Sequence, residues 1–315
     1  MIDQIAPTET CRACGLPLNT NEFIHDGLCA ECAVLRSTQA PTDAFSAARF
    51  DVSPVAQEAS IDPDHPRWGP VAGIGVWLIS LVAIIVIPML AVVSWYLIQS
   101  ARGRPVPSMV ARDEMLDWLK SPNLLLVQVL STILAHVITI TACWALVTRL
   151  GARPFWASLG WNWAGRSVWY WLAFSACIIV ALLIASQMLS RFLPQSDENS
   201  FAELLKSSQR VRIAVAVLAT FTAPLVEETV YRGVLFSSLR RYLGLVATVL
   251  VVTVMFAGIH VLQYRGAWVS IAGLTMLSFV LTVVRARTKS ILPCVLIHTL
   301  NNAFFSVLIL FNKAS

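Results

Sequence analysis

Long runs of apolar residues, separated by short polar or charged stretches, dominate the chain after residue 69. A helix needs about twenty apolar residues to cross a bilayer. Seven runs meet this requirement or come close to it, namely residues 70–98, 123–148, 167–190, 210–241, 243–262, 267–285 and 290–311. The pattern predicts an all-α polytopic membrane protein with about seven or eight transmembrane helices.

The composition agrees with this pattern. Of the 315 residues, 57% are hydrophobic and 13% are charged, whereas a soluble domain carries about 25% charged residues. The net charge of +5 is modest and spread over several loops, which favours contact with anionic lipid headgroups over a nucleic-acid partner. No short apolar run typical of a signal peptide lies near Met1, so we expect residues 70–98 to act as an uncleaved anchor.

Residues 1–36 contain two CxxC pairs, Cys11-Cys14 and Cys29-Cys32. Four thiolates in this arrangement bind Zn²⁺ tetrahedrally, which predicts a zinc-ribbon-like module with a structural zinc. Two disulfides are the alternative if this part faces an oxidising compartment. A site closed by four protein ligands has no open position for chemistry, so we expect a structural role or the docking of a partner.

Three further regions follow this module. Residues 37–69 mix Pro, Ser, Ala and Asp without a lasting apolar period and are predicted to be a flexible linker. Residues 70–121 are predicted to form the first transmembrane span and a charged loop. Residues 122–315 then form the main membrane domain.

The run 210–241 carries charges within apolar sequence, and a charge at the centre of a bilayer costs at least about 2.5–3.5 kcal/mol. Glu228 and Arg232 are spaced i,i+4, so they are able to form an ion pair on a helix. Glu227 lies about 100° further round the helix, where the same arginine does not easily reach it. Pro224 predicts a kink, or a second helical piece that begins with the proline. One carboxylate is left over, and this surplus indicates a functional site.

Two later spans also contain polar groups. His260 ends one span, and His298 and Asn302 share a helical face in the last. Neutral imidazoles hold a water molecule or bind Zn²⁺, and a carboxylate takes the proton from that water. The remaining His or Asn donors would stabilise an oxyanion. The structural alternative is that each group only forms hydrogen bonds across helices, which is the role we expect for His136 in the span 123–148.

The motifs EExxxR (Glu227 to Arg232), FxxxH (Phe256 to His260) and HxxxN (His298 to Asn302) occur in this order. They resemble the motifs of the CPBP family of intramembrane proteases (CAAX protease and bacteriocin-processing, also called Abi), over roughly residues 122–311. The resemblance implies that Glu227 is the general base and that the Glu228–Arg232 pair fixes the site. It also implies that three further residues complete the catalytic centre, namely His260, His298 and Asn302.

By this resemblance the chain is an intramembrane endopeptidase acting on a membrane-embedded or lipid-anchored protein or peptide, of CAAX-like or bacteriocin type. The resemblance leaves a metalloprotease, with His260 and His298 as zinc ligands, and a glutamate protease both open. A non-proteolytic immunity or scaffold protein, or a proton-coupled transporter, is the alternative, because proton relays also use intramembrane Glu, Arg and His. We expect a bacterial inner membrane, with the zinc module and its thiolates on the reducing, cytoplasmic side.

Overall fold

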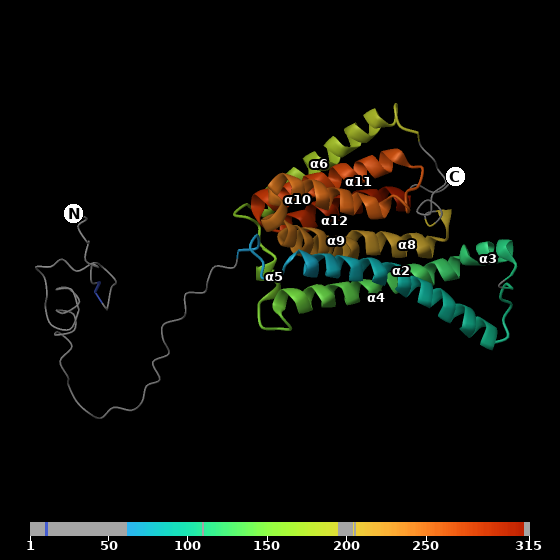
Figure 1. Cartoon of the computed structure of the whole chain (residues 1–315). Coiled ribbons are helices and arrows are strands. Elements are labelled where there is room, and N and C mark those ends of the chain that lie inside the picture. The colour runs from blue at the N-terminus through green and yellow to red at the C-terminus, as the bar shows by residue number, and fades with distance from the viewer. Residues whose placement is uncertain (1–9, 12–61, 109, 195–203, 205, 312–315) are drawn as a thin grey trace, which may run out of the picture. The chain divides into compact units, whose positions relative to one another are not determined.

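The computed structural model describes residues 10–11, 62–108, 110–194, 204 and 206–311. The chain divides into two units, Met1–Glu58 and Ala59–Ser315. The predicted zinc module and most of the predicted linker fall outside the described residues, so the structural zinc stays a prediction. The second unit is a bundle of helices and is shown in Figure 1.

Six helices in the described part of the chain are long and apolar enough to cross a membrane. They are α2 (Pro70–Ala101), α4 (Pro122–Thr148), α6 (Val168–Leu189), the helical stretch Gln209–His260, α11 (Trp268–Thr288) and α12 (Leu292–Phe311). Two short helices, α3 (Arg112–Leu119) and α5 (Phe155–Ser158), lie in the connections. The protein is therefore an all-α polytopic membrane protein, as its apolar pattern predicts.

The helical stretch Gln209–His260 turns back on itself at Gly244. A straight helix of this length would measure about 78 Å, more than twice the hydrocarbon thickness of a bilayer. Gly244 has φ 74° and ψ −179°, a conformation that is essentially restricted to glycine. The rings of Tyr231 and Phe256 lie 5.1 Å apart, whereas a straight helix would separate these residues by about 38 Å. A division of this stretch was predicted between residues 241 and 243 and is observed slightly later, at Gly244, so the stretch accounts for two passes.

The first of these passes, residues 209–243, is called the central helix below. It consists of α8 (Gln209–Val217), η1 (Leu218–Thr222), α9 (Ala223–Glu228), η2 (Thr229–Leu235) and the first part of α10 (Phe236–His260). Both η1 and η2 are π-helical, a rare geometry with i→i+5 hydrogen bonds that often marks functional sites. Glu227 and Glu228 are the last two residues of α9, the short α-helical segment between η1 and η2.

Pro224 does not interrupt the central helix. It lies in the first turn of α9, close to the second of the two arrangements expected for it. The backbone nevertheless stays helical across the junction, with φ −91° and ψ −41° at Thr222. A proline in an α-helix clashes with the carbonyl four residues earlier, and here the π-helical turn η1 directly precedes it. The real break in this stretch is at Gly244, where the chain reverses.

The central helix is enclosed by other elements of the bundle. Its segments contact α2, α4, α11 and α12, and η2 also contacts α10. Gly73 permits a close approach of α2, because a Cβ atom at this position would lie 2.7 Å from Ser238 Cβ. Val234, Leu235 and Phe236 are completely buried in the core of the bundle. Side chains of the central helix therefore face protein over much of their surface.

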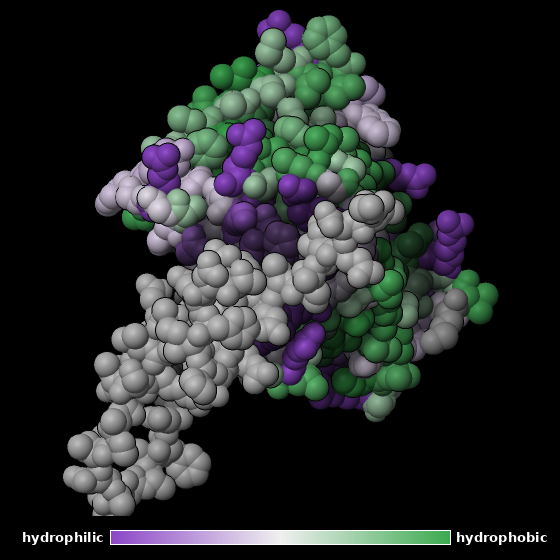
Figure 2. All heavy atoms as spheres, turned by 60° about the vertical axis from the view of Figure 1, so that its left-hand side comes forward, coloured by the Kyte–Doolittle hydropathy of each residue, from purple (hydrophilic) through white to green (hydrophobic). Residues whose placement is uncertain are grey.

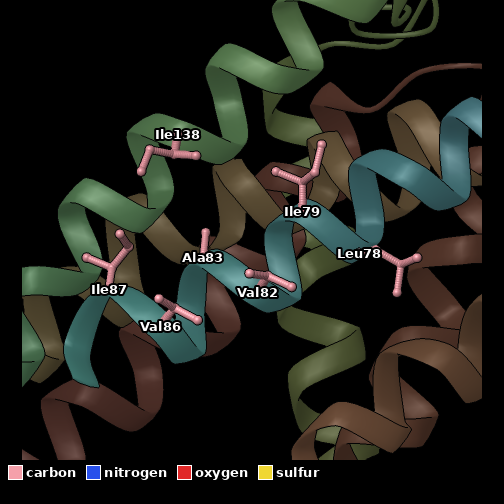
Figure 3. A pocket seen from close by; sticks show the side chains of 7 residues that line it. All are labelled: Leu78, Ile79, Val82, Ala83, Val86, Ile87 and Ile138. Carbon is pink, nitrogen blue, oxygen red and sulfur yellow. The ribbon is translucent and has the colours of Figure 1, made fainter. Parts of the chain in front are cut away.

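The outer surface of the bundle is apolar. Figure 2 shows hydrophobic side chains over much of the upper and lower right parts of the molecule, with hydrophilic ones across the middle and at a few points of the edge. A shallow groove of about 370 Å³ between α2 and α4 is lined only by aliphatic side chains (Figure 3), namely Leu78, Ile79, Val82, Ala83, Val86, Ile87 and Ile138. Such a surface suits acyl chains of a lipid bilayer.

Candidate active site

Glu228 and Arg232 form the ion pair predicted from their spacing. Arg232 Nη1 lies 3.0 Å from Glu228 Oε1, and both side chains are completely buried. The pair straddles the change from α-helical to π-helical geometry, because Glu228 ends α9 and Arg232 lies in η2. A buried ion pair is tolerated only when further hydrogen bonds satisfy its remaining donors and acceptors.

Helix α11 supplies these further bonds. Arg232 Nη2 donates to both the carbonyl oxygen and the Oγ of Ser278, each at 2.8 Å. Arg232 Nε donates to Thr282 Oγ1 at 3.3 Å. The guanidinium also lies over the ring of Phe256, 4.8 Å from its centroid, a favourable position for a cation. All three guanidinium nitrogens are thus bonded, and Arg232 is fixed in one orientation.

His298 connects the ion pair to the second glutamate. Its Nδ1 donates to Glu228 Oε1 at 2.8 Å, and its Nε2 lies 3.7 Å from Glu227 Oε2. In the neutral ring a proton on Nδ1 leaves Nε2 as an acceptor. His298 Nε2 and Glu227 Oε2 are then both acceptors, and they lie too far apart for a direct hydrogen bond. A hydrogen-bond donor or a cation placed beside both atoms would bind both of them.

The two adjacent glutamates differ in their surroundings. The Glu227 side chain is 24% exposed, whereas that of Glu228 is completely buried. Among the described residues, Glu228 Oε2 has no hydrogen-bond partner, although Oε1 receives both Arg232 and His298. Glu228 is therefore held by its neighbours, while Glu227 retains access to small molecules.

His260 joins the site through an aromatic contact rather than a direct bond. Its Nδ1 donates to the carbonyl of Phe256 at 2.8 Å, which leaves Nε2 as the acceptor of the neutral ring. The Phe256 ring centroid lies 4.8 Å from that of His260 and 6.0 Å from that of His298. Phe256 thus lies between the two imidazoles, and the FxxxH and HxxxN motifs meet at its ring.

Asn302 points to a different neighbour. Its Nδ2 donates to the carbonyl of Ala219 in η1 at 2.9 Å, and its Oδ1 accepts from Asn301 Nδ2 at 3.2 Å. An amide nitrogen carries two hydrogens, so the bond to Ala219 uses one of them. His136, expected from the sequence to form a hydrogen bond across helices, has its Nδ1 3.1 Å from Thr222 Oγ1, as that expectation requires.

The histidines only partly fit a metal site. A metal-ligating histidine normally donates its other ring nitrogen to a carboxylate or a carbonyl, as His298 and His260 do here. Glu227 Oε2 and His298 Nε2, at 3.7 Å, are also close enough to share a zinc ion with bonds of about 2 Å. Within the described part of the chain, however, no three His, Cys, Asp or Glu side chains are arranged to hold a metal ion. The ligand set is incomplete.

Three polar residues of α11 were missed at the sequence level. Ser278 and Thr282 bind Arg232, and Arg285 binds its main-chain carbonyl at 3.1 Å. A signal for them was present, because residues 278, 282 and 285 have the i, i+4, i+7 spacing of one helical face. A polar stripe within an apolar span indicates a buried polar partner.

A comparison with protein families agrees with this geometry. Residues 209–304 match the family model described as type II CAAX prenyl endopeptidase Rce1-like. The match covers less than a third of the chain and includes all three motifs. It supports membership of the CPBP family, and with it a CAAX-type endopeptidase that works within the membrane. Searches among curated proteins and among solved structures gave no match.

Proposed function

We propose that this protein is an intramembrane endopeptidase in which Glu227 activates the attacking water. The observation that carries the proposal is the pairing of Glu227 Oε2 with His298 Nε2 at 3.7 Å, beside a completed Glu228–Arg232 pair. Since Glu228 is occupied by two partners, Glu227 is the carboxylate left for proton transfer. The Rce1-like match over residues 209–304 supports the same reaction class.

A site at Glu227 and His260 would lie within the bilayer. Glu227 and His260 lie 17 and 16 residues from the turn at Gly244, which corresponds to about 24–26 Å along each helix. A hydrocarbon layer measures about 30 Å, so with the turn near one surface the site would lie in the half of the layer farther from that turn. Charged groups at this depth need partners or water, and the partly exposed Glu227 is the residue that would contact water.

The reaction follows from the orientation of these groups. A water molecule beside Glu227 Oε2 and His298 Nε2 gives a proton to Glu227, and its oxygen attacks the carbonyl carbon of the peptide bond. The carbonyl oxygen becomes an oxyanion. When the carbon–nitrogen bond breaks, the protonated Glu227 returns its proton to the departing amine. Glu228 keeps His298 in the orientation that the first step needs.

Asn302 is the proposed residue with a donor left for the oxyanion. The neutral rings of His260 and His298 both present an acceptor at Nε2, because Nδ1 donates elsewhere. The Asn302 amide has a second hydrogen beyond the one bonded to Ala219. Removing one such donor commonly costs about 10²–10³ in kcat. We therefore assign Asn302 to the oxyanion and His260 to holding water.

Whether the site also uses a metal is a separate question with a direct test. Zinc would supply a Lewis acid and a more acidic bound water; His260 and His298 are its proposed ligands, and within the described residues no third His, Cys, Asp or Glu side chain completes the set. Metal analysis of the full chain should be compared with that of a variant in which Cys11, Cys14, Cys29 and Cys32 are Ser. Zinc that remains in the Cys→Ser variant, and is lost with His298→Ala, would assign a metal to this site.

The substrate class and the orientation extend the same proposal. We assign a membrane-embedded or lipid-anchored substrate of CAAX-like or bacteriocin type, in a bacterial inner membrane, with the N-terminus cytoplasmic. Arg240 and Arg241 directly precede the Gly244 turn, and Arg287 and Lys289 end the α11 span. The loops on the opposite side carry a similar number of basic residues, so this count does not decide the orientation; we assign it from the thiolates of the zinc module, which need a reducing side. The zinc module would dock a partner on that side.

The central test is Glu227→Gln in protein reconstituted in lipid nanodiscs. Two probes cover the substrate classes: a fluorogenic peptide ending in a farnesylated CAAX sequence, and an unlipidated peptide fused to an apolar membrane helix. We expect at least a hundredfold loss of kcat with an unchanged melting temperature, because general-base catalysis contributes about 10²–10⁴. Glu114→Gln in the exposed helix α3 is the matched control and should behave as wild type.

Two results would contradict the proposal. One is wild-type cleavage rates in the Glu227→Gln protein. The other is a wild-type protein that cleaves neither probe but moves protons across the membrane, with the proton movement lost in Glu227→Gln. The second result would favour the transporter alternative.

A further inference from the structure

The π-helical segment η2 receives hydrogen bonds from side chains outside its own helix. Arg285 Nε donates to the carbonyl of Arg232 at 3.1 Å. Trp68 Nε1 donates to the carbonyl of Val234, also at 3.1 Å. These donors come from α11 and from the residues that precede α2. The geometry of the segment that carries Arg232 therefore depends on parts of the chain far away in sequence.

Arg285 is a second completely buried arginine. Besides Arg232, its guanidinium donates to Ser237 Oγ at 2.9 Å and to the carbonyl of Pro63 at 3.2 Å. It also lies 5.1 Å from the ring centroid of Phe236. A buried guanidinium needs a carboxylate partner, because an uncompensated charge is strongly destabilising. Asp64 supplies that partner, with Oδ1 2.7 Å from Arg285 Nη1.

Residues 63–68, called the strap below, thus contact the bundle at three points. Pro63 and Asp64 both bind Arg285, and Trp68 binds η2 directly. The residue before the strap, Asp62, makes a more exposed contact with Lys289, 3.3 Å away. The end of the predicted linker is consequently in contact with the membrane domain, at the end of α11 through Asp62, Pro63 and Asp64 and at η2 through Trp68.

The contacts form a continuous chain from the strap to the site. Asp64 binds Arg285, which binds the main chain of Arg232. The side chain of Arg232 binds Glu228, which in turn binds His298. Each link is a hydrogen bond of 3.1 Å or less, and four of its five members are at most 2% exposed. We therefore expect a displacement of the strap to be transmitted through these bonds to Glu228.

We propose that the strap is a positioning element of the site, in which Asp64 holds Arg285 so that Arg285 holds the π-helical turn carrying Arg232. Its effect on catalysis rests on the proposed peptidase function. Its effect on η2 does not, because that effect concerns the local stability of a helix. Asp64 and Arg285 are positioning residues, since neither touches Glu227 or His298 in the bonds described.

The experiment compares Asp64→Asn with Asp62→Asn in the full-length protein in nanodiscs. The two substitutions are chemically identical and two residues apart, but only Asp64 binds Arg285. The first readout is amide hydrogen exchange of residues 229–235, with α6 as an internal reference. The second is kcat and KM on the farnesylated CAAX peptide. Asp64→Glu, which keeps the charge, and Trp68→Phe, which removes the donor to Val234, complete the set.

We expect Asp64→Asn to raise exchange in residues 229–235 at least tenfold while leaving α6 unchanged. In the same variant kcat should fall about tenfold with KM within twofold of wild type. Asp64→Glu should recover part of both effects, and Trp68→Phe should raise exchange in η2 by a smaller factor. Asp62→Asn should match wild type in both readouts.

Three results would overturn the proposal. They are unchanged exchange in η2, an equal effect of Asp62→Asn, and exchange raised throughout the bundle, which would show general loosening. If wild type shows no peptidase activity and Asp64→Asn still raises exchange locally in η2, the strap is supported and the proposed function is contradicted. Normal cleavage by wild type, combined with unchanged exchange in Asp64→Asn, would contradict the strap alone.

Discussion

The bundle contains two buried arginine–carboxylate pairs that resemble each other closely. Arg232 pairs with Glu228, and Arg285 pairs with Asp64. Each guanidinium lies over a phenylalanine ring, binds a serine hydroxyl and binds at least one main-chain carbonyl. The pairs differ in how far apart their two residues lie in the sequence. The first joins residues four apart on one helix, and the second joins residues 221 apart.

This difference separates their roles. The Glu228–Arg232 pair forms wherever that stretch is helical, so it is available to fix the proposed catalytic histidine. The Asp64–Arg285 pair forms only when the strap lies against the bundle, so it stabilises the bundle in its assembled form. Its carboxylate is also 13% exposed, whereas Glu228 is completely buried. The following predictions test whether the two pairs differ as their surroundings indicate, from the largest effect to the smallest.

Arg232→Met should give the largest loss of stability, about 3–5 kcal/mol in the free energy of unfolding, because it leaves the Glu228 carboxylate buried without its cation. The double variant Glu228→Gln/Arg232→Met should regain more than half of that loss, since it removes both charges. Denaturant unfolding in mixed micelles measures both. A loss below about 1 kcal/mol in the single variant would show that water or His298 replaces the guanidinium.

Arg285→Met should cost less, about 2–3 kcal/mol. Breaking a buried ion pair costs about 3–5 kcal/mol when the remaining charge is left buried, and the loss here should be smaller because the partly exposed Asp64 remains accessible to water. Adding Asp64→Asn to Arg285→Met should therefore recover little stability, unlike the Arg232 cycle. Equal recovery in the two double-variant cycles would remove the distinction between the pairs.

Gly244→Ala should cost about 1–2 kcal/mol, because a side chain is strained at φ 74°. The turn at Gly244 brings Phe256 under the Arg232 guanidinium, so loosening it should affect the first pair before the second. Gly258→Ala is the matched control. It lies in the same helix, with no atom within 4 Å of the added methyl group, and should leave the melting temperature unchanged or raise it.

Asp62→Asn should have the smallest effect, below about 1 kcal/mol, as is usual for exposed ion pairs. Burial raises the pKa of the Asp62 carboxyl. Hydrogen bonds from the Asp64 backbone, His65 and Lys289 lower the pKa by a larger amount, so that its net value is about 2. The unfolded carboxyl has a pKa of about 3.9. The contribution of Asp62 is therefore complete above about pH 4 and is lost as the pH falls towards 2. Unfolding curves of wild type and variant should converge over that range.

Much of the membrane fold was predictable because hydrophobic runs report directly on the energy of inserting a helix. The predicted span 123–148 is observed as Pro122–Thr148, and the predicted span 267–285 as Trp268–Thr288. The ion pair of Glu228 and Arg232 was also predictable, because it depends only on helical spacing. The π-helical turns around Glu227 were not, because the sequence signal was a proline that indicated a break.

The arrangement of the site depended on contacts that no local pattern encodes. The motifs placed His298 and Glu228 in one site, but only the packing of α12 against α9 shows that they share a hydrogen bond. In the same way, Ser278 and Thr282 look like ordinary small polar residues of a span until Arg232 is placed against them. Likewise, only the structure shows that the Asn302 amide donates one of its hydrogens to the carbonyl of Ala219 in η1.

The sequence by itself determined that the protein crosses a membrane on helices and that three motifs bring acids, an arginine, histidines and an asparagine into apolar spans. Local spacing and the cost of burying charge are sufficient for these conclusions. Only the tertiary structure decided that Glu228 also binds His298, how Gly244 folds Phe256 back onto Arg232, and that Asp64 neutralises Arg285. Those outcomes depend on residues far apart in the chain, whose pairing is decided by the packing of whole helices.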